Sequence, residues 1–189
     1  MSTRLPGLVE SVHARAEQHG FTLSCDPAVG AFLAALAAAV PQGGRILELG
    51  TGVGTGLAWL VHGLGTREDV SVVSVDIDPD IQAIARAAPW PDWVELALGD
   101  AAALLPTLGH FDLVFADAPG GKLERLDLSL AALQPRGLLV VDDMDLSLHE
   151  EDGLQDAIAR VRVEMLAMPE LRCAELDFGS GVILGVRQA

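Results

Sequence analysis

A buried strand that runs directly into a glycine-rich loop is the feature that most restricts how this chain can fold. Residues 45–49 (RILEL) have the apolar character of a buried strand, and residues 55–62 have that of a helix. Glycines occupy every second position at this junction, at Gly50, Gly52, Gly54 and Gly56. Such glycines let a ligand approach the backbone amides at the start of the helix. The pattern therefore predicts an α/β unit that binds a nucleotide-like ligand.

The spacing of these glycines separates two classes of ligand. A dinucleotide loop follows GxGxxG, which counted from Gly50 needs a glycine at position 55, where this chain has Thr55. The residues instead spell an acid, Glu48, one spacer and glycines two apart, which resembles the first motif of class I S-adenosylmethionine-dependent methyltransferases. That cofactor carries an amino group and a sulfonium in place of a pyrophosphate, so a carboxylate is tolerated beside it. The resemblance implies cofactor contacts from Glu48, Gly50, Thr51, Gly52 and Gly54.

Length and charge limit the choice of partners. The chain has 189 residues, 50% of them hydrophobic, enough for one domain over residues 1–189 with N-terminal helices in 1–40 and a core in 44–189. Its formal net charge is −15. Nucleic acid and membrane are therefore not expected as partners, because both bind basic surfaces. A small molecule is the expected partner. Homodimerisation through the N-terminal helices or a C-terminal hairpin is left open.

The two cysteines and the N-terminal sequence bear on localisation. Cys25 and Cys173 have no CxxC spacing, so neither a disulfide framework nor a zinc site is indicated. Residues 1–20 are too polar for a secretory signal, and residues 31–40, the most apolar run, are too short to span a bilayer. We therefore expect a cytoplasmic protein.

Predicted strands and helices alternate along most of the chain. After the first strand, strands are expected at residues 70–76, 94–98, 111–117 and 137–143. Helices are expected at residues 5–19, 27–39, 55–62, 79–88, 101–105, 123–133 and 151–168. Residues 172–178 and 182–187 are typical of a terminal hairpin. This order predicts a Rossmann-like, doubly wound α/β fold, mostly parallel with an antiparallel C-terminal hairpin strand and helices on both faces.

Acidic residues finish the predicted parallel strands one after another. They are Glu48, Asp76, Asp100, Asp117, Asp142 and Asp143. Each alone is as readily a helix cap or a turn former, and Asp78 is expected to be a cap. Ligands of open α/β sheets bind at the carboxyl ends of the strands, so acids at five strand ends in succession predict a binding site there.

The second and third strand ends are predicted to hold the nucleoside. An acid at Asp76 can accept hydrogen bonds from both ribose hydroxyls, and VDIDP (residues 75–79) resembles the second methyltransferase motif. Ile77 is expected to contact the adenine ring. The resemblance implies that Gly99, Asp100 and Ala101 frame the adenine, with Asp100 accepting from its amino group.

The later motifs are similar to those of the cation-dependent O-methyltransferases, the group that contains catechol and caffeoyl-coenzyme A methyltransferases. These motifs are DPAVGAFLAAL, FDLVFADAPGGK and GLLVVDDM. The resemblance implies further cofactor contacts from Val29, Gly30 and Asp117. It also implies that Asp117, Asp142 and Asp143 hold Mg²⁺ or another divalent cation, which suits oxygen ligands. Asp143 stands where the family usually has Asn, so a changed metal preference, an outer-shell Asp143 and a site without metal all stay open.

Lys122 is the only lysine, whereas the other basic residues are arginines. A desolvated lysine can act as a base, so Lys122 is a predicted catalytic residue. Asp117 is the other predicted catalytic residue. Lys122 follows Asp117 by five positions, whereas the family's lysine follows its aspartate by three, so an exposed loop lysine is an equal alternative. His149 is a weaker candidate for an acid or base.

Histidines and tryptophans elsewhere are expected to be structural. His13, His19 and His62 have no partner at metal spacing, and Trp59, Trp90 and Trp93 are expected to pack.

The sequence thus predicts an S-adenosylmethionine-dependent enzyme that methylates a hydroxyl of a small aromatic acceptor, with a divalent cation. The alternatives are a metal-independent N- or O-methyltransferase, a non-catalytic S-adenosylmethionine-binding protein and, less favoured, a nicotinamide-dependent reductase.

Overall fold

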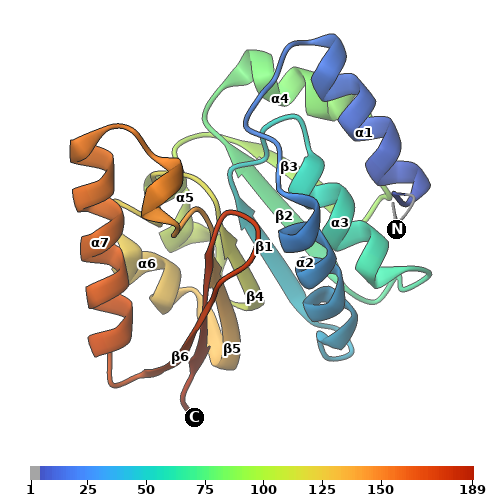
Figure 1. Cartoon of the computed structure of the whole chain (residues 1–189). Coiled ribbons are helices and arrows are strands. Elements are labelled where there is room, and N and C mark those ends of the chain that lie inside the picture. The colour runs from blue at the N-terminus through green and yellow to red at the C-terminus, as the bar shows by residue number, and fades with distance from the viewer. Residues whose placement is uncertain (1–4) are drawn as a thin grey trace.

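A seven-stranded sheet forms the centre of the computed structural model, which describes residues 5–189 (Figure 1). Residues 1–4 of the predicted N-terminal region lie outside the described part. The strands are β1 (Arg45–Leu49), β2 (Ser71–Asp76), β3 (Val94–Leu98), β4 (Phe111–Ala116), β5 (Leu133–Val141), β6 (Leu171–Leu176) and β7 (Val182–Arg187). Their order across the sheet is β3-β2-β1-β4-β5-β7-β6.

The pairing of the strands confirms the predicted doubly wound topology. Strands β1 to β5 are parallel, whereas β7 is antiparallel to both β5 and β6. The chain leaves β1 toward β2 on one side, and β4 lies on the other side of β1. Loops that follow β1 and β4 therefore diverge, and this divergence opens a crevice at the carboxyl edge of the sheet.

Helices cover both faces of the sheet (Figure 1). Their bounds are α1 (Gly7–Gln18), α2 (Pro27–Ala39), α3 (Thr55–Leu64), α4 (Pro79–Arg86), α5 (Ala101–Leu108), α6 (Leu126–Ala131) and α7 (Asp152–Ala167), with a 3₁₀ turn, η1, at Leu146–Leu148. Within residues 5–189, no helix combines the length and apolarity needed to cross a membrane.

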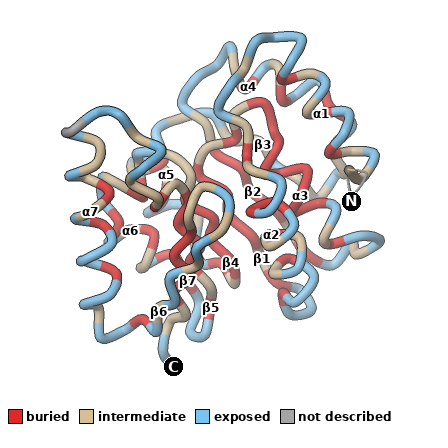
Figure 2. Tube along the Cα trace, in the orientation of Figure 1, coloured by how far each residue is buried: buried red, intermediate tan, exposed pale blue. Residues whose placement is uncertain are grey.

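Alternating side chains divide the interior into two cores. Ile46 packs with α1, α2 and α3, whereas its neighbour Leu47 packs on the opposite face with α5, α6 and α7. Glu48 follows in this alternation and therefore points to the α3 side. In Figure 2 the buried residues lie along the strands and on the sheet-facing sides of these helices.

Two predicted elements differ most from the structure. Helix α6 begins at Leu126 instead of residue 123, because the backbone amides of Leu123 and Glu124 both donate to the Pro119 carbonyl and form a turn. Strand β5 begins at Leu133, earlier than predicted, and its pairing with β4 shifts between Phe111 and Leu113. The sequence QPRG at residues 134–137 is not typical of a strand, so the sequence did not predict this irregular start.

Close packing of α2 on α3 depends on Gly63. A Cβ atom there would lie 2.1 Å from the Ala34 carbonyl oxygen, which is backbone and cannot move aside. We expect Gly63→Ala to lower the free energy of unfolding by about 1 to 3 kcal/mol. Gly7→Ala is the matched control, because nothing lies within 4 Å of its Cβ position. Urea denaturation measures both, and equal stabilities would contradict the packing argument.

Candidate active site

The loop between β1 and α3 is held against the ends of the neighbouring strands. The amides of Gly50 and Thr51 both donate to the Val75 carbonyl, at 2.8 and 3.1 Å. Gly50 has φ 101°, and a Cβ atom there would lie 2.7 Å from the Asp117 carbonyl oxygen. The glycine therefore lets the loop pass directly over the end of β4.

Gly54 has a packing role in the same loop. It is the left-handed residue before α3, and a Cβ atom there would lie 2.7 Å from the Trp90 ring. The Trp90 indole in turn donates to the Ala85 carbonyl at 2.8 Å. Gly54 was predicted to contact the cofactor, but it does not line the cavity beside the loop.

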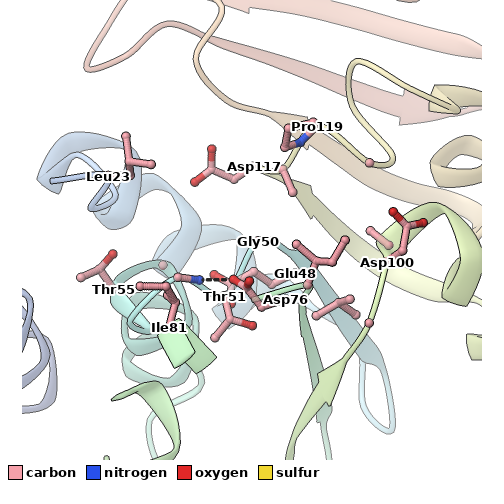
Figure 3. Close-up of a pocket in the computed structure, with 18 of the residues that line it drawn as sticks. Leu23, Glu48, Gly50, Thr51, Thr55, Asp76, Ile81, Asp100, Asp117 and Pro119 are labelled. Carbon is pink, nitrogen blue, oxygen red and sulfur yellow. Dashed lines mark hydrogen bonds between the residues drawn. The ribbon is translucent and has the colours of Figure 1, made fainter. Parts of the chain in front are cut away.

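Asp76 ties the second strand end to the glycine loop. One of its carboxylate oxygens accepts from the Gly52 amide at 2.7 Å and the other accepts from the Asp78 amide at 2.9 Å (Figure 3). The carboxylate is thereby fixed at the cavity wall with lone pairs to spare. Asp78 caps α4 by accepting from Asp80 and Ile81, as predicted.

A cavity of about 370 Å³ lies at the carboxyl edge of the sheet. Figure 3 shows its walls, with the glycine loop and strand ends on one side and Leu23, Asp117 and Pro119 on another. The predicted cofactor residues that line it are Glu48, Gly50, Thr51, Gly52, Asp76, Ile77, Gly99, Asp100, Ala101 and Asp117. The structure thus brings together most of the predicted set.

Val29 and Gly30 do not reach this cavity. Val29 is fully buried in the core beneath α2. A Cβ atom at Gly30 would lie 2.2 Å from the Trp59 ring, so this glycine admits the tryptophan between helices. The prediction of cofactor contacts for these two residues is corrected: they pack α2 instead.

The far end of the cavity has the apolar and polar groups expected of a nucleoside site. Ile77 is 66% exposed although it is a large apolar residue, so its side chain is free to cover a ring. Asp100 caps α5 by accepting from the Ala103 amide at 2.8 Å through one oxygen. Its second oxygen is available to the cavity, so capping and ligand binding are compatible.

Glu48 is a completely buried carboxyl at the cavity wall. Its Oε2 accepts from the Ser74 hydroxyl at 2.5 Å, and Ser74 is hydrogen bonded to Thr51 at 2.6 Å. Its Oε1 has no hydrogen-bond partner, and Gly56 leaves the space beside that atom. Burial raises the pKa of Glu48 to about 8, although the Ser74 hydrogen bond acts in the opposite direction.

A second cavity, of about 500 Å³, adjoins the first. The two share Leu23, Asp117 and Pro119 in their walls. Apart from these three, its wall is formed by Thr22, Ser24, Cys25, Asp26, Lys122, Leu123, Asp142, Asp143, Leu148, His149, Leu154, Ile158 and Ser180. Asp117 is the charged residue among the three shared residues, so its carboxylate lies where the two cavities meet.

Lys122 lies among the three carboxylates at the floor of the second cavity. Oxygens of Asp117, Asp142 and Asp143 all lie within 4.8 Å of one another. The Lys122 Nζ is 3.1 Å from Asp143 Oδ2, 3.7 Å from Asp117 Oδ1 and 3.3 Å from the Asp142 carbonyl oxygen. Lys122 is only 5% exposed, so the alternative of an exposed loop lysine is wrong.

The turn after β4 explains how Lys122 reaches the carboxylates despite its shifted spacing. The Lys122 amide donates to the Pro119 carbonyl, and Gly121 has φ 86°. The Ser129 hydroxyl holds the Gly121 carbonyl at 2.7 Å. The two extra residues are therefore absorbed in a tight turn, and the lysine side chain points back to the strand ends.

The carboxylates of this cluster differ in their affinity for protons. Burial raises the pKa of Asp117 well above its usual range, with Lys122 partly opposing the shift. Burial likewise raises the pKa of Asp142, against the Ser180 hydrogen bond. For Asp143, burial is outweighed by the Lys122 charge and by hydrogen bonds, so its pKa is lowered.

The arrangement of these residues does not fit the predicted divalent cation. Three carboxylates are suitable ligands by chemistry, and they do converge. The Lys122 ammonium, however, already lies 3.7 Å from Asp117 Oδ1 and 3.1 Å from Asp143 Oδ2. A second cation bound at about 2.0 to 2.6 Å from the same oxygens would be strongly repelled. The predicted ligands are brought together, but the predicted metal is not confirmed.

Residues 21–26 form part of both cavities, and they belong to the segment, residues 1–26, that was expected to line the acceptor pocket. Phe21 and Leu23 line the first cavity, and Leu23 is 80% exposed. The Cys25 amide donates to the Thr55 hydroxyl at 3.0 Å and fastens this segment to the start of α3.

The C-terminal side of the second cavity also differs from expectation. Ser180, in the β6–β7 turn, was missed, although its hydroxyl donates to Asp142. His149 does line the cavity, and its Nε2 lies 3.0 Å from the Asp143 carbonyl oxygen. His13, His19 and His62 lie on or beside α1 and α3, away from the residues that line the cavities.

The doubly wound sheet, the glycine loop and the acid after β2 together define a class I methyltransferase. Residues 47–144 match the sequence profile of a family described as "Methyltransferase domain". The protein named "Probable O-methyltransferase Rv1220c" from Mycobacterium tuberculosis strain H37Rv is 33% identical over 174 residues, 85% of this chain and 76% of that protein. The chain belongs to the S-adenosylmethionine-dependent O-methyltransferases.

Solved structures share this fold over nearly the whole chain. Cofactor-bound Rv0187 from MTB has a TM-score of 0.85 and 26% identity, covering 97% of this chain and 91% of that one. The O-methyltransferase from Bacillus cereus in complex with SAH has a TM-score of 0.83 and 24% identity, covering 100% and 94%.

Proposed function

We propose that this enzyme transfers the methyl group of S-adenosylmethionine to a hydroxyl of a small acceptor with an apolar, aromatic body. The observation that carries the proposal is the meeting of the two cavities at Asp117. The cofactor would occupy the first cavity and the acceptor the second. Apolar side chains in the second cavity support an apolar acceptor: Leu23, Pro119, Leu123, Leu148, Leu154 and Ile158.

The reaction is an in-line displacement at the methyl carbon. The acceptor oxygen forms a bond to this carbon while the carbon–sulfur bond breaks, and sulfur keeps the bonding electron pair as the thioether of S-adenosylhomocysteine. The acceptor's proton passes to the Asp117 carboxylate. Its raised pKa makes Asp117 a better proton acceptor than an ordinary aspartate. Alignment of the two substrates can supply about 7 to 11 kcal/mol of barrier lowering.

Lys122 has a different role from the predicted base. Lys122 is an ion-pair partner of Asp117 and Asp143, and a lysine ammonium donates hydrogen bonds and accepts none. We therefore assign proton acceptance to Asp117 and stabilisation of the acceptor oxygen to Lys122.

Calorimetric titration and product analysis test this proposal. We expect S-adenosylhomocysteine to bind and NADH to give no heat. A panel of phenols and amines, incubated with S-adenosylmethionine and analysed by mass spectrometry, should yield methyl ethers. Methylated amines alone would favour the N-methyltransferase alternative, and cofactor binding without any methylated product would favour a binding protein.

Both cysteines are free, which supports a reducing, cytoplasmic location.

Asp76→Asn should weaken S-adenosylhomocysteine binding by about 10- to 100-fold. The change removes a charged acceptor for the ribose hydroxyls, and such hydrogen bonds contribute about 1.5 to 3 kcal/mol. Asp80→Asn removes the same charge from an exposed position two residues into α4 and outside the cavity wall. Calorimetry compares the two variants. Equal affinities would place the ribose away from Asp76.

A further inference from the structure

The cluster of Asp117, Asp142 and Asp143 has a positively charged partner within the chain. The ammonium of Lys122, the only lysine, is buried between Asp117 and Asp143 at the floor of the acceptor cavity. We propose that this ammonium takes the place of a divalent metal ion, so that the enzyme methylates its acceptor without metal. The proposal rests on the proposed function, because it names the group that faces the acceptor oxygen.

The hydrogen bonds of Lys122 leave one donor for a ligand. An ammonium has three N–H donors. Among the described residues, Lys122 uses one on Asp143 Oδ2 at 3.1 Å and one on the Asp142 carbonyl at 3.3 Å. Asp117 Oδ1, at 3.7 Å, is an ion-pair partner beyond hydrogen-bond distance. The third donor is thus available to an acceptor oxygen, which a metal ion would otherwise polarise.

The remaining carboxylate is also supplied with partners from the chain. Asp142 Oδ1 accepts from the Asp143 amide at 2.8 Å and from the Ser180 hydroxyl. Asp142 Oδ1 and Asp143 Oδ2 are therefore both already held by donors of the chain. Asp117, at the junction of the two cavities, is the member of this cluster that lines both of them.

Two departures from the family pattern explain each other in this arrangement. Asp143 adds a negative charge where the family has the neutral Asn, and Lys122 lies two positions later than the family's lysine. The structure pairs these two residues at 3.1 Å. The positive charge of Lys122 balances the extra negative charge of Asp143. Both changes therefore serve the same end, which is to replace a bound metal ion with a cation of the chain.

Manganese binding tests the proposal without depending on activity. Mn²⁺ is titrated into the wild type, Lys122→Met and Arg125→Met, with electron paramagnetic resonance reporting the free ion. Arg125 is an exposed residue of the neighbouring turn that pairs with Asp127, so its replacement makes the same charge change outside the cluster. We expect weak and equal binding by the wild type and Arg125→Met, and at least about tenfold tighter binding by Lys122→Met. Adding Asp117→Asn to Lys122→Met should remove the gain.

Three results would overturn the proposal. One is Mn²⁺ binding by the wild type as tight as by Lys122→Met. Another is a Lys122→Met variant that binds no more tightly than Arg125→Met. The third is wild-type methyl transfer that is lost after chelation and restored by Mg²⁺ or Mn²⁺. Lys122→Ala replaces Lys122→Met if thermal denaturation shows the latter unfolded, and the wild-type measurements need no variant.

A parallel titration with S-adenosylhomocysteine separates this proposal from the proposed function. If the wild type binds both the cofactor and Mn²⁺ tightly, only the proposal that Lys122 replaces the metal ion is overturned. Failure to bind the cofactor would instead overturn the proposed function, whatever the Mn²⁺ result.

Discussion

Replacing Asp117 with asparagine is expected to lower kcat by about 10²- to 10⁴-fold, the range typical of removing a general base. Asparagine keeps the size and one hydrogen-bond acceptor of the side chain but cannot take up the acceptor's proton. Because the cofactor cavity is otherwise unchanged, S-adenosylhomocysteine affinity should stay within about threefold, well under 1.4 kcal/mol. Steady-state kinetics and calorimetry on the same preparation measure the two effects.

The position and proton affinity of Asp117 explain the size of this expected loss. Asp117 lines both cavities, and burial raises its pKa well above the usual range. A base with a raised pKa accepts a proton more readily, provided that it is ionised in the working enzyme. Activity of the wild type should therefore fall as pH falls through the Asp117 pKa, and this limb of the pH profile should be absent from the residual activity of Asp117→Asn.

Asp156→Asn provides the control for the loss of one carboxylate. Asp156 is exposed on α7 and does not line either cavity. It should keep wild-type kcat. Full activity in Asp117→Asn would show that another group takes the proton, and His149 would be the next candidate because it lines the same cavity.

The glycine loop and the acidic strand ends were predictable because they follow from local pattern and topology. The chain places Glu48, Asp76 and Asp117 at the ends of parallel strands, and the carboxyl ends of such strands meet at one edge. All three do line the cavity. Here the sequence order alone determines which side chains converge.

Lys122, Val29 and Leu23 were harder to place because their environment is set by distant contacts. The turn that brings Lys122 to Asp143 depends on a hydrogen bond from Ser129 to Gly121, which spacing does not reveal. Val29 lies in an apolar helix whose buried and exposed faces are similar in sequence. Leu23 lies in a loop held by a contact between Cys25 and Thr55, thirty positions apart.

Glu48→Gln is expected to change how stability depends on pH. In the folded protein burial raises the pKa of Glu48 from 4.5 to about 8. Below pH 4.5 the carboxyl is protonated in both the folded and unfolded states. Between pH 4.5 and 8 the unfolded chain releases the proton and the folded protein keeps it, so stability falls as pH rises. Above about pH 8 both states are ionised and the loss is complete.

Glutamine cannot ionise, so the variant should lack this loss. The free energy of unfolding of Glu48→Gln, relative to the wild type, should rise between pH 5 and pH 8 by up to about 4 kcal/mol, since each unit of pH in this interval corresponds to at most about 1.36 kcal/mol. Urea denaturation at the two pH values measures the difference. Glu95→Gln, at an exposed position of β3, controls for the loss of one carboxylate.

Cofactor binding should change the difference in the free energy of unfolding between the wild type and Glu48→Gln. Glu48 lines the cavity that would hold the ammonium and sulfonium of S-adenosylmethionine, and nearby positive charge favours the ionised carboxylate. Saturating S-adenosylmethionine should therefore stabilise the wild type more than Glu48→Gln at pH 8. The gap between their free energies of unfolding should become narrower. S-adenosylhomocysteine, which lacks the sulfonium charge, should narrow it less. A gap that neither ligand narrows would place the cofactor's charges beyond electrostatic reach of Glu48. A gap that is the same at pH 5 and pH 8 without ligand would show that Glu48 is ionised in the folded protein throughout this range.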